Sequence, residues 1–208
     1  MLVRPREADR TQNKRGVRTP DSPLLFCKVN KMIDLQESTT IRTDRLAPRR
    51  PEAADAARIA GLASDIEVTR MTASMPHPYG QADAATFLAC VARADPAREA
   101  EFAIEHPREG LIGMLGFRPN EHGRTELGYW LGRPYWGRGY ATEAVKASLR
   151  WAKTSWGRRW LVSGHFADNP ASAAVLIKSG FLYTGDVGQH FSRARGCAAP
   201  SRMMVWLA

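Results

Sequence analysis

The most constraining feature of this sequence is a glycine-containing turn between a strand pattern and a helix pattern. Residues 126–131 read Glu-Leu-Gly-Tyr-Trp-Leu, and residues 136–144 read Trp-Gly-Arg-Gly-Tyr-Ala-Thr-Glu-Ala. A helix that begins in this turn leaves up to about four backbone N–H groups unpaired at its positive end. Because Gly137 and Gly139 let a ligand approach the backbone closely, the turn predicts an anion site of the kind that binds phosphate.

Two common nucleotide-binding motifs do not describe this turn. The sequence contains no G-x-x-x-x-G-K-[ST], which excludes a P-loop. Gly137 and Gly139 are followed by Thr142, so the dinucleotide fingerprint G-x-G-x-x-G also fails. Glycine turns before helices are common for purely structural reasons, and the turn alone leaves that reading open.

The periodicity on both sides of the turn predicts the fold class. Short turns join three strand patterns at 101–105, 111–117 and 124–131, which favours antiparallel hairpins. The other elements that we expect are strands at 40–49, 159–166, 181–187 and 203–207, and helices at 53–63, 81–94, 141–153 and 170–179. The order predicts an α+β domain with a mixed sheet of about six or seven strands, an antiparallel first half and about four flanking helices.

Charge is distributed unevenly along the 208 residues. The net charge is +9, and residues 1–31 hold eight Lys/Arg against three Asp/Glu, which leaves +4 for the rest. We predict a basic disordered leader at 1–36 and one domain at 37–208. The leader is either a passive tail, an upstream start-site artefact or an arm that contacts a ribosome or RNA. A mildly basic domain suits an anionic cofactor as well as a polyanion.

Composition narrows the remaining classes. Cys27, Cys90 and Cys197 are too widely spaced for a metal cluster and odd in number for a disulfide framework. No apolar run reaches the roughly 20 residues that span a bilayer, and the N-terminus lacks the apolar stretch of a secretory signal. We therefore expect a cytoplasmic protein without membrane contact and without a metal.

Three segments together resemble the GCN5-related N-acetyltransferases (GNAT). The turn is similar to the Q/R-x-x-G-x-G/A pyrophosphate loop of that family, with Gly139 and Ala141 at its small-residue positions and Trp136 in place of Gln or Arg. Residues 43–46 and 49–51 resemble the opening T-x-R-L strand of the ribosomal-protein-alanine N-acetyltransferase branch. Residues 168–172 and 178–181 resemble the N-x-x-S…G-F helix of the same branch.

The resemblance implies the GNAT fold and acetyl-CoA as cosubstrate. It also implies that two neighbouring strands splay apart and that the pantetheine arm bonds to an exposed strand edge beside a second helix N-terminus. Asn169 and Pro170 form a strong start for that helix on structural grounds alone. The residues expected to bind the cofactor are Tyr129, Trp130, Leu131, Trp136, Gly137, Arg138, Gly139, Tyr140, Ala141, Thr142, Asn169 and Ser172.

Acetyl transfer to an amine needs a base, an oxyanion donor and a group that meets the departing thiolate. Glu126 is our first choice of base and His165 the second; the alternatives are a solvated strand-edge carboxylate and a structural histidine. Ser172 could hydrogen-bond the sulfur or simply cap its own helix. A tyrosine and a glutamate found in some relatives are replaced by Leu176 and Thr184. We expect a backbone N–H of the strand containing Tyr129 to face the oxyanion.

The acceptor stays open at this stage. The resemblance favours a protein N-terminus, and a small amine such as an amino acid, polyamine or antibiotic is the second version. A non-catalytic acyl-CoA-binding module is an alternative, favoured if Glu126 and His165 both point away from the cleft. A ribosome- or RNA-binding protein acting through the leader is another, although no nucleic-acid-binding motif supports it. Dimers are frequent in the family, so a homodimer is compatible with the resemblance.

Overall fold

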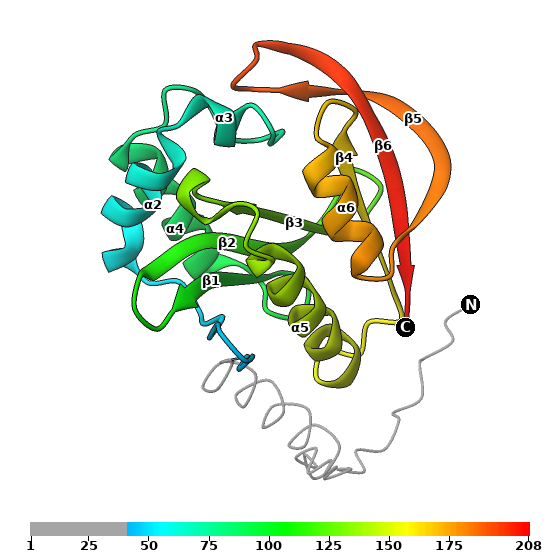
Figure 1. Ribbon diagram of the computed structural model, residues 1–208, viewed down its shortest axis with the longest axis horizontal. Coiled ribbons are helices and arrows are strands. Elements are labelled where there is room, and N and C mark those ends of the chain that lie inside the picture. The colour runs from blue at the N-terminus through cyan, green and yellow to red at the C-terminus, as the bar shows by residue number, and fades with distance from the viewer. Residues whose placement is uncertain (1–40) are drawn as a thin grey trace, which may run out of the picture.

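The computed structural model describes residues 41–208, and the leader predicted at 1–36 lies outside this part of the chain. The described residues form a six-stranded mixed sheet in the order β1-β2-β3-β4-β6-β5 (Figure 1). Strands β1, β2 and β3 are antiparallel, β3 and β4 are parallel, and β6 runs antiparallel to both of its neighbours. The predicted α+β class, with an antiparallel first half of the sheet, is confirmed.

Most elements lie where the sequence pattern placed them. The strands are β1 (Ala100–His106), β2 (Gly110–Pro119), β3 (Thr125–Leu131), β4 (Trp160–Phe166), β5 (Leu182–Ser192) and β6 (Cys197–Leu207). The helices are η1 (Ala53–Asp55), α2 (Ala56–Ala63), α3 (Ile66–Thr69), α4 (Gln81–Arg93), η2 (Arg133–Tyr135), α5 (Tyr140–Thr154) and α6 (Pro170–Lys178). The short helix α3 was not predicted, and β5 and β6 are both longer than predicted.

The strand predicted at 40–49 is wrong for the residues that can be checked. Residues 41–49 make a single isolated bridge, from Arg49 to Ala103 on β1. Thr43 folds the segment into a tight turn, since its N–H donates to the Leu46 carbonyl at 2.9 Å. Pro48 has no N–H to donate to a neighbouring strand. The apolar residues that suggested a strand therefore belong to a loop that runs beside β1.

Two apolar clusters cover the two faces of the sheet. One packs α5 and α6 against one face, with residues such as Phe117, Leu127 and Leu176 at its centre. The other packs α2 and α4 against the opposite face of β1 and β2, around Ile59 and Met114. The sheet is thus covered on both sides, and α2 and α4 lie on the side opposite to α5 and α6 (Figure 1).

The centre of the sheet opens between its two parallel strands. Strands β3 and β4 pair at one register position, Glu126 with Val162. Beyond that position residues 128–131 of β3 and 163–166 of β4 line a cleft instead of bonding to each other. The splayed strands that the family resemblance implied are present, and they position the site described below.

The long β5–β6 hairpin curves over one end of this opening and is fastened there (Figure 1). Near its tip the Ser192 hydroxyl donates to the Thr72 carbonyl at 3.0 Å, and the Arg193 N–H donates to the Ala73 carbonyl at 3.0 Å. The Arg195 guanidinium donates to both carboxylate oxygens of Asp168, at 2.9 and 3.0 Å. The hairpin tip is therefore bonded both to the loop after α3 and to the loop after β4.

Candidate active site

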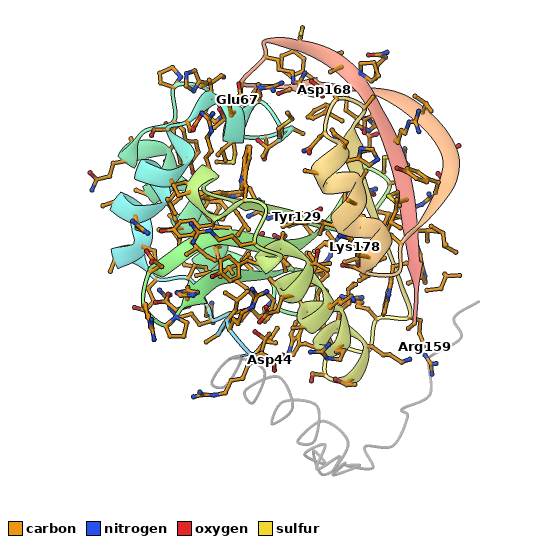
Figure 2. All side chains as sticks on the ribbon, in the orientation of Figure 1. Asp44, Glu67, Tyr129, Arg159, Asp168 and Lys178 are labelled. Carbon is orange, nitrogen blue, oxygen red and sulfur yellow. The ribbon has the colours of Figure 1, made fainter. Side chains whose placement is uncertain are left out.

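A cleft of about 960 Å³ crosses the molecule through the gap between β3 and β4. Its walls come from the N-termini of α5 and α6 on one face of the sheet and from α4 and the loop after α3 on the other. Figure 2 shows Tyr129 deep inside, with Glu67 and Asp168 on the two sides of the upper opening. Arg70 lies between these two acids, 2.7 Å from Glu67 and 3.3 Å from Asp168, and links the two rims.

The glycine turn has the geometry that an anion site requires. Gly137 and Gly139 adopt left-handed φ values of 72° and 79°, which favour glycine over residues with a side chain. The first helical bond of α5 runs from the Glu143 N–H to the Gly139 carbonyl. The N–H groups of 139–142 donate to no residue that the structure describes, and they are available at the positive end of a 15-residue helix.

Residues 43–46 are hydrogen-bonded to this turn and to the first turn of α5. The Thr43 hydroxyl donates to a Glu143 carboxylate oxygen at 2.5 Å, and Arg45 Nε donates to the other at 2.7 Å. Burial alone would raise the pKa of Glu143, but these hydrogen bonds outweigh it and lower the pKa. Arg45 also donates to the Arg138 carbonyl at 3.0 Å, so a half-exposed guanidinium is held at the turn. Sequence reasoning missed this role of Arg45.

The remaining predicted residues of the turn divide into two groups. Trp136, Tyr140, Ala141 and Thr142 line the cleft, whereas the Arg138 side chain is exposed outside it. Trp136 donates its indole N–H to the Leu131 carbonyl at 2.7 Å. This bond fixes the turn to the end of β3.

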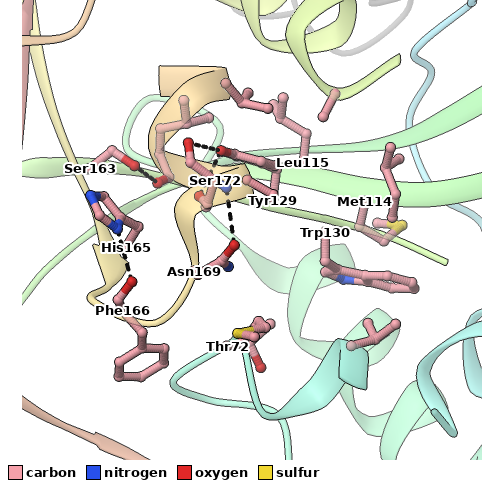
Figure 3. A pocket seen from close by; sticks show the side chains of 18 of the residues that line it. Thr72, Met114, Leu115, Tyr129, Trp130, Ser163, His165, Phe166, Asn169 and Ser172 are labelled. Carbon is pink, nitrogen blue, oxygen red and sulfur yellow. Dashed lines mark hydrogen bonds between the residues drawn. The ribbon is translucent and has the colours of Figure 1, made fainter. Parts of the chain in front are cut away.

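Tyr129 and Ser172 meet across the gap in the sheet (Figure 3). The Tyr129 hydroxyl lies 2.8 Å from the Ser172 Oγ, and the Asn169 side chain accepts a hydrogen bond from the Ser172 N–H at 3.0 Å. Burial raises the pKa of Tyr129 well above its usual range, against the opposing effect of the Ser172 hydrogen bond. The phenol is therefore neutral and can donate a proton or a hydrogen bond at the start of α6.

Glu126 faces the cleft from the opposite side of the sheet, because side chains alternate along a strand. It shares that face with Gly128 and Trp130, and Trp130 packs toward α2 and α4. Burial raises the pKa of Glu126, while the charge of His190 and a hydrogen bond from Asn120 lower it. The net result is a partly buried carboxylate whose proton affinity is higher than usual.

His165 lines the cleft but has both ring nitrogens engaged. Its Nδ1 lies 2.9 Å from the Phe166 carbonyl, which can only accept, so this nitrogen carries the hydrogen. In a neutral ring its Nε2 then accepts from the Tyr183 hydroxyl, 3.0 Å away. This arrangement fits the structural reading of His165, and Glu126 remains the candidate base.

Several cleft residues had no signal in the linear sequence. Glu101 and Arg118 lie on β1 and β2 on the same face as Glu126, and His190 reaches the cleft from β5. Gly116, Gly128 and Gly164, on β2, β3 and β4, line the cleft as well, and of these only Gly128 has open space where a Cβ would be. Only the register between strands brings these positions together, and no local motif marks them.

Within residues 41–208 no group of three or more His, Cys, Asp or Glu side chains is arranged to hold a metal ion. The same residues contain no helix that is long and apolar enough to cross a membrane.

Known proteins resemble this chain over most of its length. The family description "Acetyltransferase (GNAT) domain" matches residues 45–182. An uncharacterized N-acetyltransferase, p20 of Bacillus licheniformis, is 30% identical over 161 residues, which are 76% of this chain and 89% of p20. The ribosomal-protein-serine acetyltransferase of Escherichia coli K12 is 32% identical over 82 residues, which are 38% of this chain and 45% of that protein.

The fold is also found among solved structures. The ribosomal-protein-S5-alanine acetyltransferase from Vibrio fischeri superposes with a TM-score of 0.70 at 16% identity, over 82% of this chain and 97% of that one. The splayed strands and the glycine turn are features that the family resemblance implied, and the matches point to the same family. The chain belongs to the GNAT acetyltransferase family.

Proposed function

We propose that this N-acetyltransferase moves the acetyl group of acetyl-CoA to a primary amine by direct attack, with Glu126 as the base. The observation that carries the proposal is one continuous cleft. It joins the free N–H groups of the glycine turn to the partly buried carboxylate of Glu126, through the gap between β3 and β4.

The residues present fit the cofactor. The left-handed turn at Gly137 and Gly139 and the guanidinium of Arg45 suit a pyrophosphate, which needs N–H donors and positive charge. The unpaired edge of β3 after Glu126 offers backbone groups to the pantetheine amides. Acetyl-CoA supplies the activated acetyl thioester when it is bound.

Groups on opposite faces of the sheet carry out the two proton-transfer steps, removal of a proton from the acceptor and donation to the leaving thiolate. The Glu126 carboxylate accepts a proton from the acceptor ammonium, which must be neutral before it can attack. A raised pKa makes Glu126 a stronger base than an exposed glutamate, at the cost of being ionised only at higher pH. The hydroxyls of Tyr129 and Ser172 donate a hydrogen bond or a proton to the departing sulfur.

The non-catalytic alternative is not favoured by the geometry. It required Glu126 and His165 both to point away from the cleft, and both line it. The RNA-binding alternative depends on the leader, which lies outside the described residues. The E. coli relative named above acts on a ribosomal protein, so a protein N-terminus is one acceptor to be tested. A small amine is the other.

The direct test is acetyl transfer by the purified full-length chain. Acetyl-CoA is mixed with a panel of free amino acids, polyamines and peptides with free N-termini, and both the released CoA thiol and the acetylated product are measured. We expect thiol release with at least one class, together with one new acetyl group on that acceptor. A folded protein that binds acetyl-CoA but acetylates no member of the panel would contradict the proposal.

Removing the hydroxyl that faces the leaving sulfur should slow turnover moderately. We expect Tyr129→Phe and Ser172→Ala each to lower kcat by about 10- to 100-fold, since a thiolate is already a fair leaving group. The affinity for acetyl-CoA, measured by calorimetry, should stay near that of the wild type. Tyr183→Phe, which removes the phenol bonded to His165, is the matched control. A wild-type kcat in both variants would show that the hydroxyls of Tyr129 and Ser172 take no part in the reaction.

A further inference from the structure

Arg118 on β2 has a guanidinium that is held on one side and free on the other. Its Nε donates to a Glu101 carboxylate oxygen at 2.5 Å, and its charged plane lies 5.1 Å from the centre of the Phe87 ring on α4. Its two terminal nitrogens, Nη1 and Nη2, donate to no described residue. The side chain is 43% exposed and lines the cleft. Two parallel N–H donors of this kind match a carboxylate.

Glu101 can hold Arg118 only because its neighbour across the sheet is a glycine. Glu101 on β1 faces Gly116 on β2, and a Cβ at Gly116 would lie 2.1 Å from a Glu101 carboxylate oxygen. The Glu101 side chain is 7% exposed, and burial raises its pKa to about 7 despite the charge of Arg118. A buried carboxylate of this kind disfavours its own ionised form, and what it achieves here is the fixed orientation of Arg118.

The cross-strand partner of Arg118 is Glu126. Residues directly opposite on antiparallel strands have Cβ atoms about 5 Å apart, close enough for these two charges to pair. Within the described chain Arg118 is paired with Glu101 and makes no ion pair with Glu126. The cleft therefore presents a carboxylate that has no ion pair among the described residues, next to a guanidinium with two free terminal nitrogens.

The rest of this half of the cleft is largely apolar. Met71 and Met75 line it from the loop after α3, Phe87 from α4, and Met114 and Trp130 from the sheet. A ligand complementary to these walls carries an ammonium, a carboxylate close to it, and an apolar group. That combination is a zwitterionic α-amino acid.

We propose that the acceptor is a free α-amino acid with an apolar side chain, whose carboxylate binds Arg118 while its amine faces Glu126. This inference rests on the proposed acetyl transfer. A protein N-terminus carries a neutral amide in place of the carboxylate, so it cannot form an ion pair with the two terminal nitrogens of Arg118. A polyamine brings further positive charge toward Arg118, which repels it.

The test compares each amino acid with its own amide. Acetylation of L-leucine, L-methionine and L-phenylalanine is measured against leucinamide, methioninamide and phenylalaninamide, with spermidine and Ala- or Ser-starting peptides in the same assay. We expect the wild type to favour at least one acid over its amide by 30-fold or more in kcat/KM. Arg118→Gln should lower kcat/KM for that acid by about 10- to 100-fold, mainly through KM, and leave the amide unchanged.

Two further variants make the result decisive. Arg93→Gln on α4 removes an exposed arginine that does not line the cleft and should behave as the wild type. Arg118→Gln combined with Glu101→Gln avoids a buried unpaired carboxylate, so the preference for the acid can be measured even if the single variant is unstable.

The outcomes separate this inference from the proposed function. If the wild type acetylates amides, peptides or spermidine as well as or better than the free acids, acetyl transfer stands and the amino-acid acceptor is wrong. An equal loss for acid and amide in both Arg118 variants would also overturn it. If no amine of any class is acetylated, the proposed function itself fails.

Discussion

Replacement of Gly139 by glutamate is expected to abolish acetyl-CoA binding. At a φ of 79° a residue with a side chain costs roughly 1–2 kcal/mol of strain, and a Cβ there would lie 3.4 Å from an Arg45 terminal nitrogen. The new carboxylate would pair with Arg45 and repel the pyrophosphate from the N-terminus of α5. Calorimetry should show a loss of affinity of at least about 100-fold, equivalent to two tenfold steps of about 1.4 kcal/mol each.

A matched substitution separates loss of the site from loss of the fold. Gly157 has a similar φ of 72°, has open space around it and does not line the cleft. Gly157→Glu therefore carries the same backbone strain and the same added charge, and it should bind acetyl-CoA as the wild type does. If Gly139→Glu and Gly157→Glu bind equally well, the turn is not the pyrophosphate site.

Glu126→Gln should reduce kcat by about 10²- to 10⁴-fold, the range typical of a lost general base. The substitution keeps the shape of the side chain and removes only its ability to accept a proton, so acetyl-CoA affinity should not change. Glu121→Gln, an exposed acid in the preceding loop, is the control and should keep full activity. An activity of Glu126→Gln within a few-fold of the wild type would mean that the amine loses its proton to another group or to water.

The pH profile gives a second readout of Glu126. The base acts in its ionised form, and burial raises the pKa of Glu126, so activity should be lost on acidification at a higher pH than for an exposed glutamate. In Glu126→Gln that limb should vanish and leave the dependence that comes from the amine alone. The measurement is kcat/KM against pH with one acceptor.

The structural features that depend on a few adjacent residues could be predicted from the sequence. The glycine turn, the Asn169 cap and the hairpins depend on a few adjacent residues, and the structure shows all three. The loop at 41–49 was misread because its apolar residues suggested a strand, whereas Pro48 and the turn at Thr43 prevent one. The lengths of β5 and β6 were underestimated because much of β5 is exposed, so its pairing with β6 leaves little hydrophobic alternation.

Contacts between distant segments could not be read from the sequence. Tyr129 was expected to act through its backbone, but its phenol meets Ser172, 43 residues later in the chain. The group of Glu101, Arg118 and Glu126 depends on the register of three strands, and a shift of one residue would turn each side chain to the other face. Such a group becomes visible only when the strands are aligned.

Two glycines that line the cleft also bear on how substrate preference can diverge among related enzymes. Gly116 cannot gain a side chain without displacing Glu101, so it is tied to the orientation of Arg118. Gly128, beside it on β3, has no atom within 4 Å of where a Cβ would be. A mutation to alanine at Gly128 would therefore narrow the cleft by one methyl group without a steric clash. The width of the cleft can therefore change in small steps at Gly128, while Gly116 must stay a glycine to keep the contact between Glu101 and Arg118.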